Sequence, residues 1–182
     1  EETESSESEG EEDVTEAFEM EQTCADVTVC MSAPEGVFPK GAYFEVREVN
    51  NYEEENIDKA ISEISDSKEQ VAASYTYDIT VYDKDGNEIE PNTDYGQVSV
   101  TFSLKEAEDD TLQAKVYHIE GSGDELSAEE LETTVSGDEV TVLTDGFSVY
   151  TLKFIYENVL KYTYTVETGY VSLSDILNAC KI

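Results

Sequence analysis

The sequence predicts a mainly β protein, an antiparallel β-sandwich of the immunoglobulin-like kind with one inserted amphipathic helix. Short runs of alternating apolar and polar residues recur along residues 23–154, and Gly, Pro, Asn and Asp residues separate these runs. Within that range a single stretch has a helical period instead. Many short alternating strands with regular turns are typical of a sandwich, in which each strand has one buried and one wet face.

The first predicted strands flank a turn rich in proline and glycine. Val27, Val29 and Met31 alternate with polar residues and therefore share one face. Residues 34–41 contain two Pro-x-Gly sequences, which are turn chemistry. A second alternating strand is expected at residues 44–47, beyond this corner.

One helix is predicted near residues 53–65, where the hydrophobic period changes from two to 3.6. Acidic residues and a lysine fill the opposite face, so the helix is expected to pack by a single stripe. That stripe consists of Ile57, Ala60, Ile61 and Ile64.

Further alternating runs follow the helix, separated by turns that contain Gly and Asp. Two of these runs have clear inward faces, at Tyr77, Ile79 and Val81 and at Val98, Val100 and Phe102. Other strands are expected at residues 113–119, around 130–135, at 139–144 and at 147–154.

The two ends of the chain differ from the predicted sandwich. Residues 1–22 contain eleven acids and no base, a composition that predicts a disordered acidic leader. Residues 155–182 predict a hairpin followed by a short helix, because Tyr162 and Tyr164 alternate with threonines and a capping box opens at Ser172. So small a unit has no core of its own, and we expect either an extension docked on the sandwich or the start of a second module.

The charge balance excludes whole classes of partner. The chain carries 44 Asp and Glu against 10 Lys and Arg, a formal net charge of −34, which repels nucleic acid phosphates. No run of 18 uninterrupted apolar residues occurs, and residues 1–20 have neither a basic start nor an apolar segment. We therefore expect no nucleic acid partner, no membrane insertion and no signal peptide in this sequence.

Three segments carry a resemblance to a known kind of domain. Residues 27–41 read VTVCMSAPEGVFPKG, residues 77–91 read YDITVYDKDGNEIEP and residues 145–150 read DGFSVY. They resemble a module repeated in large surface proteins of Gram-positive, often gut-dwelling bacteria, and are distantly similar to ZU5 β-sandwiches, which carry a comparable proline-glycine corner. This resemblance, over roughly residues 26–154, implies an extracellular or wall-associated setting, neighbouring modules in the same polypeptide, and a host or wall glycan or protein as ligand.

The resemblance also implies a candidate covalent chemistry. Some eukaryotic relatives of ZU5 domains cut their own backbone between the Phe and the Ser of a His-Phe-Ser motif, and here Gly146 stands in place of that histidine, before Phe147 and Ser148. An N-to-O acyl shift by the Ser148 hydroxyl needs a base, for which His118, the only histidine, is the candidate. The alternative is that Gly146 belongs to a turn, Phe147 and Ser148 open a core strand, and His118 is an ordinary strand residue.

A candidate metal site lies between two predicted strands. Asp83, Asp85 and Asn87 offer oxygen ligands at alternate positions, like the opening of a calcium loop. The spacing departs from an EF-hand because Gly86 occupies the fourth position rather than the sixth. A tight hairpin turn uses the same residues, and we expect that turn, with no cofactor.

The tyrosines provide a third candidate. Tyr162, Tyr164 and Tyr170 are the best cluster for a platform that stacks on sugars, although strands also favour tyrosine for packing. No phosphate loop, nucleophile elbow or histidine-ligated metal pattern is present, so we expect no conventional enzyme. The leading hypothesis is a non-catalytic surface module that acts as a spacer or adhesion element. The alternatives are a self-cleaving domain and, more weakly, a carbohydrate-binding module.

Overall fold

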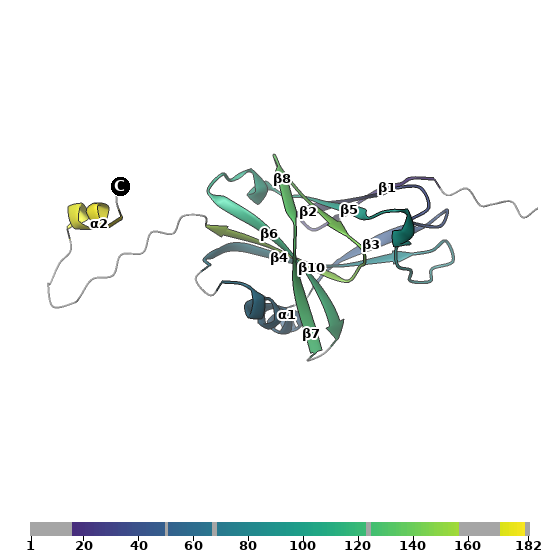
Figure 1. The fold of residues 1–182 in the computed structure, drawn as a ribbon, viewed down its shortest axis with the longest axis horizontal. Helices are drawn as coiled ribbons and strands as arrows, with labels where there is room; N and C mark the ends of the chain where they lie inside the picture. Colours follow the sequence, from purple (N-terminus) through teal and green to yellow (C-terminus); the bar gives the residue numbers. More distant parts are fainter. Residues whose placement is uncertain (1–15, 50, 67–68, 123–124, 157–171, 181–182) are drawn as a thin grey trace, which may run out of the picture.

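The computed structural model describes residues 16–49, 51–66, 69–122, 125–156 and 172–180, which contain two antiparallel sheets of five strands each. The two sheets pack face to face around one core, so the predicted β-sandwich is confirmed (Figure 1). In spatial order, sheet A consists of β1 (Phe18–Cys24), β2 (Val27–Ala33), β5 (Val98–Ser103), β9 (Glu139–Thr144) and β8 (Thr133–Ser136). Sheet B consists of β3 (Tyr43–Glu48), β4 (Val71–Tyr82), β10 (Val149–Tyr156), β6 (Leu112–Ser122) and β7 (Glu125–Leu131).

The core forms because the strands alternate apolar and polar side chains and turn their apolar sides toward each other. The rings of Tyr77, Phe102 and Tyr150 meet at its centre, with ring centroids 6.5 and 6.2 Å apart in succession. Burying each such ring stabilises the fold by about 1.5–3 kcal/mol. The inward residues predicted for three strands are all buried, namely Val27, Val29 and Met31, Tyr77, Ile79 and Val81, and Val98, Val100 and Phe102.

The inserted helix is α1 (Asn51–Ile64), which confirms the helix predicted near residues 53–65. It lies over the outer face of sheet B (Figure 1), where Ile57 and Ile61 form a second small apolar cluster with Tyr117 and Ile119. The packed stripe is shorter than predicted, because Ile64 is 48% exposed. Two short 3-10 helices, Thr93–Tyr95 and Lys105–Glu108, lie in the connections on either side of β5.

The sandwich begins earlier than the boundary predicted between residues 22 and 23. Strand β1 starts at Phe18 and pairs with β2 along its whole length. Phe18 and Met20 pack against the core, and glutamates alternate with them on the wet side. An alternating strand whose wet side is acidic has the composition of an acidic leader, so composition misplaced this boundary. Residues 1–15 of the predicted leader lie outside the described residues.

The later strands require two further corrections. The run predicted around 130–135 is two strands, β7 and β8, which Glu132 separates at the point where the chain crosses from sheet B to sheet A. Strand β10 begins at Val149 and continues to Tyr156, two residues beyond the predicted end of the sandwich. The other predicted strands fall within β6 and β9.

The short C-terminal helix predicted after Ser172 is present as α2 (Leu173–Cys180). The predicted hairpin at Tyr162 and Tyr164 lies outside the described residues. None of the helices in the described part of the chain is both long and apolar enough to cross a membrane.

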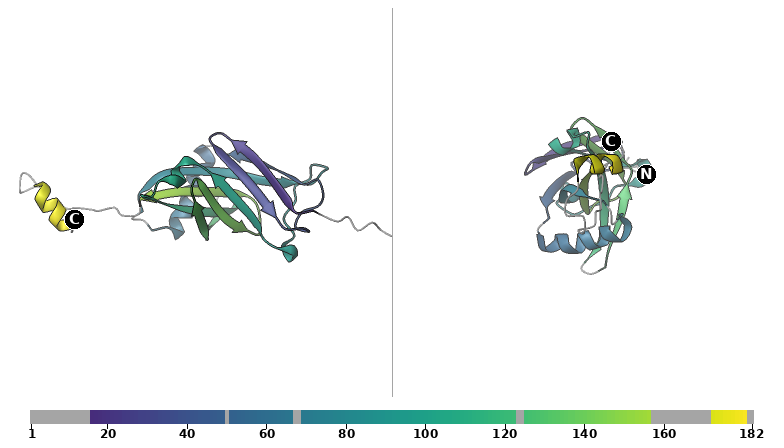
Figure 2. Two further views of the ribbon diagram at one scale, coloured as in Figure 1. Left: turned by 90° about the horizontal axis from the view of Figure 1, so that it is seen from above. Right: turned by 90° about the vertical axis from the view of Figure 1, so that its left-hand side faces the viewer.

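The chain enters and leaves the sandwich at opposite ends. Strand β1 begins at one end, which we call the entry end, and β10 finishes at the other, which we call the exit end (Figures 1 and 2). The connections from β2 to β3, from β4 to β5 and from β9 to β10 all lie at the entry end. The residues of the candidate cleavage motif therefore lie at the end where the chain enters the domain.

Candidate functional site

The candidate site is the corner between β9 and β10, which we call the β9–β10 corner. Its turn, Asp145-Gly146, is fixed by hydroxyl groups on the two strands. The Tyr150 hydroxyl donates to the Gly146 carbonyl oxygen at 2.6 Å, and the Thr144 hydroxyl lies 2.9 Å from the same oxygen and 2.8 Å from the Tyr150 hydroxyl. A buried tyrosine that bonds to backbone a few residues upstream is a recurrent device of β-sandwiches, the tyrosine corner.

The structure brings Ser148 and His118 together, as the self-cleavage hypothesis requires. Strand β10 pairs with β6 so that Tyr150 lies opposite His118, and Ser148 immediately precedes β10. The Ser148 Oγ lies 2.9 Å from the His118 Nε2. His118 is 7% exposed, and its imidazole ring stacks on the Tyr150 ring, with centroids 4.8 Å apart. The two residues are therefore in direct contact inside the entry end of the sandwich.

The hydrogen bonds around Ser148 assign a direction to this contact. The Ser148 Oγ also lies 2.5 Å from the Ile119 carbonyl oxygen, which has no proton to give, so the serine donates its single proton there. The His118 Nε2 must then carry the proton of the histidine–serine bond and donate it to Ser148. Burial lowers the pKa of His118, with Glu120 and Glu129 opposing, and the ring is therefore neutral at pH 7. In this arrangement the histidine holds the serine rather than taking its proton.

The peptide between Phe147 and Ser148 is held from both sides. The Phe147 amide donates to Glu90 Oε2 at 3.2 Å, and the Ser148 carbonyl accepts from the Ile79 amide at 2.8 Å. The Phe147 ring packs against the core, 6.0 Å from the Phe38 ring by centroids. Neither residue has a positive φ. A hydroxyl attack at this bond would first require Ser148 to release its bond to β6.

The candidate calcium loop is a hydrogen-bonded turn. The Asp83 carboxylate accepts from the amides of Asp85 and Asn87 at 2.8 and 2.9 Å and from the Asn87 side chain at 2.8 Å. These bonds, that from the Asn87 side chain first, lower the pKa of Asp83. The structure thus joins Asp83 to Asn87 directly. Within the described ranges, no group of three or more His, Cys, Asp or Glu residues is arranged to hold a metal ion.

The candidate sugar platform at Tyr162, Tyr164 and Tyr170 lies outside the described residues.

The sequence interpretation missed Thr144, Tyr150 and Glu90 as members of the β9–β10 corner. One signal was available for Tyr150, because it lies two and four residues before Leu152 and Phe154 and so shares their inward face at the period of a strand.

The chain was also compared with known proteins. No family model matches it, and neither the curated proteins nor the solved structures contain a match.

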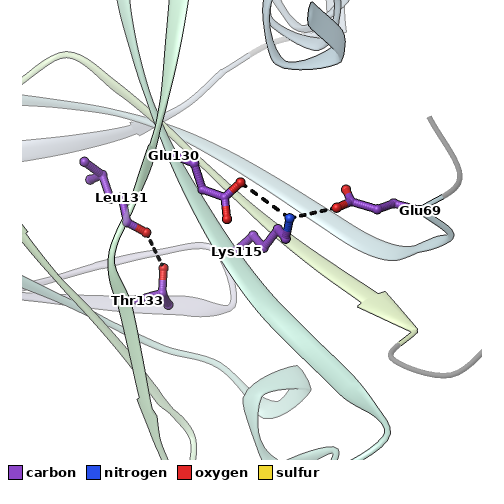
Figure 3. Close-up of polar contacts among 5 residues, drawn as sticks. All are labelled: Glu69, Lys115, Glu130, Leu131 and Thr133. Atoms are coloured by element: carbon purple, nitrogen blue, oxygen red, sulfur yellow. Dashed lines mark hydrogen bonds and ion pairs between the residues drawn. The ribbon is translucent and has the colours of Figure 1, made fainter. Parts of the chain in front are cut away.

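A second polar cluster, which the sequence did not indicate, joins sheet B to the segment before β4. The Lys115 Nζ, on β6, lies 2.7 Å from Glu69 Oε1 and 3.4 Å from Glu130 Oε2 (Figure 3). The side chains of Lys115 and Glu69 are only 16% and 17% exposed, so solvent screens their ion pair incompletely. Close by, the Thr133 hydroxyl donates to the Leu131 carbonyl at the crossing from β7 to β8 (Figure 3). These contacts join the segment before β4 and strand β7 to β6 and fix the start of β8.

Proposed function

We propose that this chain is a non-catalytic, extracellular module of a bacterial cell-surface protein, in which it acts as a structural spacer that displays adhesive surfaces. The observation that carries the proposal is the position of the two terminal strands, since β1 begins at the entry end and β10 finishes at the exit end (Figure 1). A module of this geometry adds its own length to a polypeptide. The bacterial setting follows from the sequence resemblance.

The position of β10 suits a spacer that bears load. Strand β10 has eight residues and spans about 26 Å at roughly 3.3 Å per residue. It lies inside sheet B and pairs with β4 on one side and with β6 on the other. Tension along the chain therefore acts along β10 and must shear both ladders together. Strand β1, where the load enters, lies at the edge of sheet A and resists through its one ladder with β2, which the same tension loads in shear.

The charge of the chain fits the same role. A formal net charge of −34 gives an acidic surface that repels other acidic surfaces. In a row of similar modules, this repulsion favours an extended arrangement over collapse of one module onto the next.

Single-molecule force spectroscopy on the full chain tests the proposal. The chain is held between two reference domains and pulled through its ends, so that load enters at β1 and leaves at β10. A matched control is pulled through residues 16 and 35, which lie at the same end of β1 and β2, so that these strands separate one residue pair at a time. We expect pulling through the ends to give one unfolding event that releases about 500 Å of chain from residues 16–156. We also expect it to need more force than the control.

The spacer proposal fails if the chain pulled through its ends unfolds at a force no higher than the control, or in many small steps. Either result means that the fold does not resist load along its own axis.

A second candidate function is self-cleavage between Phe147 and Ser148. The 2.9 Å contact between Ser148 Oγ and His118 Nε2 favours it, because an acyl shift needs a base beside the hydroxyl. The direction of the hydrogen bonds argues for the spacer instead. Intact mass under denaturing conditions separates the two. One species at 20.3 kDa excludes spontaneous cleavage, whereas two fragments that meet at this bond and disappear with Ser148→Ala would establish it.

A further inference from the structure

A shallow hollow of about 360 Å³ lies on the outer face of sheet A, next to β8 and β9. It forms because β8 is shorter than its neighbour. Strand β8 pairs with β9 only as far as Thr133 opposite Val142, whereas β9 continues to Thr144. The space that a longer β8 would fill is lined by Gln97, Glu132, Thr134, Thr141, Val142 and Leu143.

The lining combines hydrogen-bonding groups with one apolar surface. Gln97 offers an amide and Glu132 a carboxylate, while Thr134 and Thr141 offer hydroxyls. The Leu143 side chain is 55% exposed, which gives the hollow an apolar wall. A ligand that satisfies this set has several hydroxyl groups on its edges and a C–H face to lie against Leu143. A sugar ring has both.

Two of the polar groups are already held in place by neighbours outside the hollow. The Gln97 side-chain nitrogen donates to Asp145 Oδ1 at 2.9 Å, and the Thr141 hydroxyl lies 2.9 Å from the Thr101 hydroxyl. Side chains fixed before a ligand arrives lose less conformational entropy when it binds. The hollow is thus partly organised in advance.

The charges select among ligand classes. No Lys or Arg lines the hollow, and Glu132 lies in its wall, so an anionic ligand is disfavoured. With a single carboxylate in the wall, the hollow lacks the several charged oxygens that bind a divalent cation. A neutral polar ligand is the class that remains.

The sheet beside the hollow offers room for a longer ligand. One row of neighbouring residues crosses sheet A from Cys30 through Thr101 and Thr141 to Thr134. The flanking rows on β2 and β5 carry serine and threonine at the outward positions. This part of the face presents small uncharged side chains, with Glu21 beside Cys30 and Glu139 beside Ser103 at its border.

We propose that the hollow is a binding subsite for a neutral glycan, with one sugar ring against Leu143 and the rest of the glycan lying across the hydroxyl-lined face. The subsite rests on the proposed display function and gives the ligand class of its adhesive surface. Its volume is within the range of small-molecule sites, and its shallowness suits a chain that extends beyond it.

Amide chemical-shift mapping by NMR on the full chain tests the subsite. The probes are maltotetraose, cellotetraose, mannotetraose and chitotetraose at millimolar concentrations, with oligogalacturonate as the anionic comparison. We expect at least one neutral probe to shift the amides of Gln97, Thr134, Thr141 and Leu143. Thr134→Val removes a hydroxyl and Glu132→Gln replaces a charged acceptor with a neutral amide, and each should weaken that binding about tenfold. Thr80→Val, an isosteric change on the outer face of sheet B, should leave the affinity unchanged.

Three results would overturn the subsite. The first is the absence of amide shifts with every neutral probe, and the second is shifts that map outside the hollow or survive both variants. The third is binding of oligogalacturonate as tight as that of the neutral probes, which would contradict the ligand class. None of these results bears on the unfolding force, so the spacer proposal stands or falls separately.

Discussion

Removing the Tyr150 hydroxyl tests whether the β9–β10 corner stabilises the sandwich as its hydrogen bonds indicate. In Tyr150→Phe the fully buried ring stays, while the contacts of its hydroxyl with Gly146 and Thr144 are lost. The Gly146 carbonyl keeps the Thr144 hydroxyl at 2.9 Å, so the loss amounts to one complete bond and part of another. At about 1 kcal/mol for each neutral bond, we expect a loss of about 1.5 kcal/mol in the free energy of unfolding.

Urea and thermal unfolding of the full chain, followed by circular dichroism, measure this loss. A change of about 1.5 kcal/mol lowers Tm by about 5 °C in a domain of this size. Tyr43→Phe is the matched control, because Tyr43 is partly exposed on the outer face of sheet B, and it should change stability by less than about 0.5 kcal/mol. Equal stability of Tyr150→Phe and the unsubstituted protein would refute the hydrogen-bond assignment at the corner.

Three further changes test other parts of the fold. The lowered pKa of His118 means that the unfolded state binds more protons below pH 6.5, so the histidine costs stability as pH falls. The urea midpoint of His118→Gln, relative to that of the unsubstituted protein, should therefore rise as the pH is lowered from 7 to 5. A difference in midpoint that is the same at both pH values contradicts this. The buried hydroxyls of Thr76 and Thr151 lie 3.1 Å apart. Thr151→Val leaves the Thr76 hydroxyl without this partner and should lower the free energy of unfolding by about 1–3 kcal/mol, whereas replacing both threonines with valine should lower it less. Losses that add up in the double variant would refute this pairing. Lys115→Met should lower the free energy of unfolding by about 1 kcal/mol at low salt and by less at high salt. The control is Lys105→Met, which should lower it by under about 0.5 kcal/mol because the Lys105 side chain is 85% exposed. Equal losses in the two variants would show that solvent screens the Lys115 ion pairs too well for them to stabilise the fold.

The sandwich was predictable wherever one face of a strand is apolar and the other neutral. Strands β2 and β5 fulfil this condition, β4 departs from it only at Asp78, and the inward residues of all three are buried as predicted. The prediction was wrong where charge hid the alternation, as at β1, whose acids made it resemble a leader. It was wrong again where one run served two sheets, because nothing in the sequence at Glu132 marks a crossing rather than a continuation. Which strands pair also stayed undetermined, since pairing depends on contacts between distant residues.

The candidate site divides in a similar way. Sequence and resemblance together identified Ser148 and His118, and the structure places them in contact. The distance alone supports either hypothesis, a serine with its base or a serine held by a histidine. The Ile119 carbonyl distinguishes them, because an acceptor at 2.5 Å requires the serine proton. That carbonyl belongs to the backbone of a strand 29 residues earlier, and its position depends on the register of β6 and β10 rather than on any side chain that sequence patterns reveal.

The pairing of β8 with β9 explains why one end of the sandwich holds both the polar corner and the glycan hollow. Strand β9 continues to Thr144, whose hydroxyl fixes the turn into β10, while β8 stops pairing at Thr133. The residues that lengthen β9 thus close the corner on the inner side and leave Leu143 uncovered on the outer side. Extending β8 to cover Leu143 would bury an apolar side chain and remove the hollow. A more stable domain that has lost glycan binding is therefore the expected outcome of such a change, and retained binding would place the ligand elsewhere.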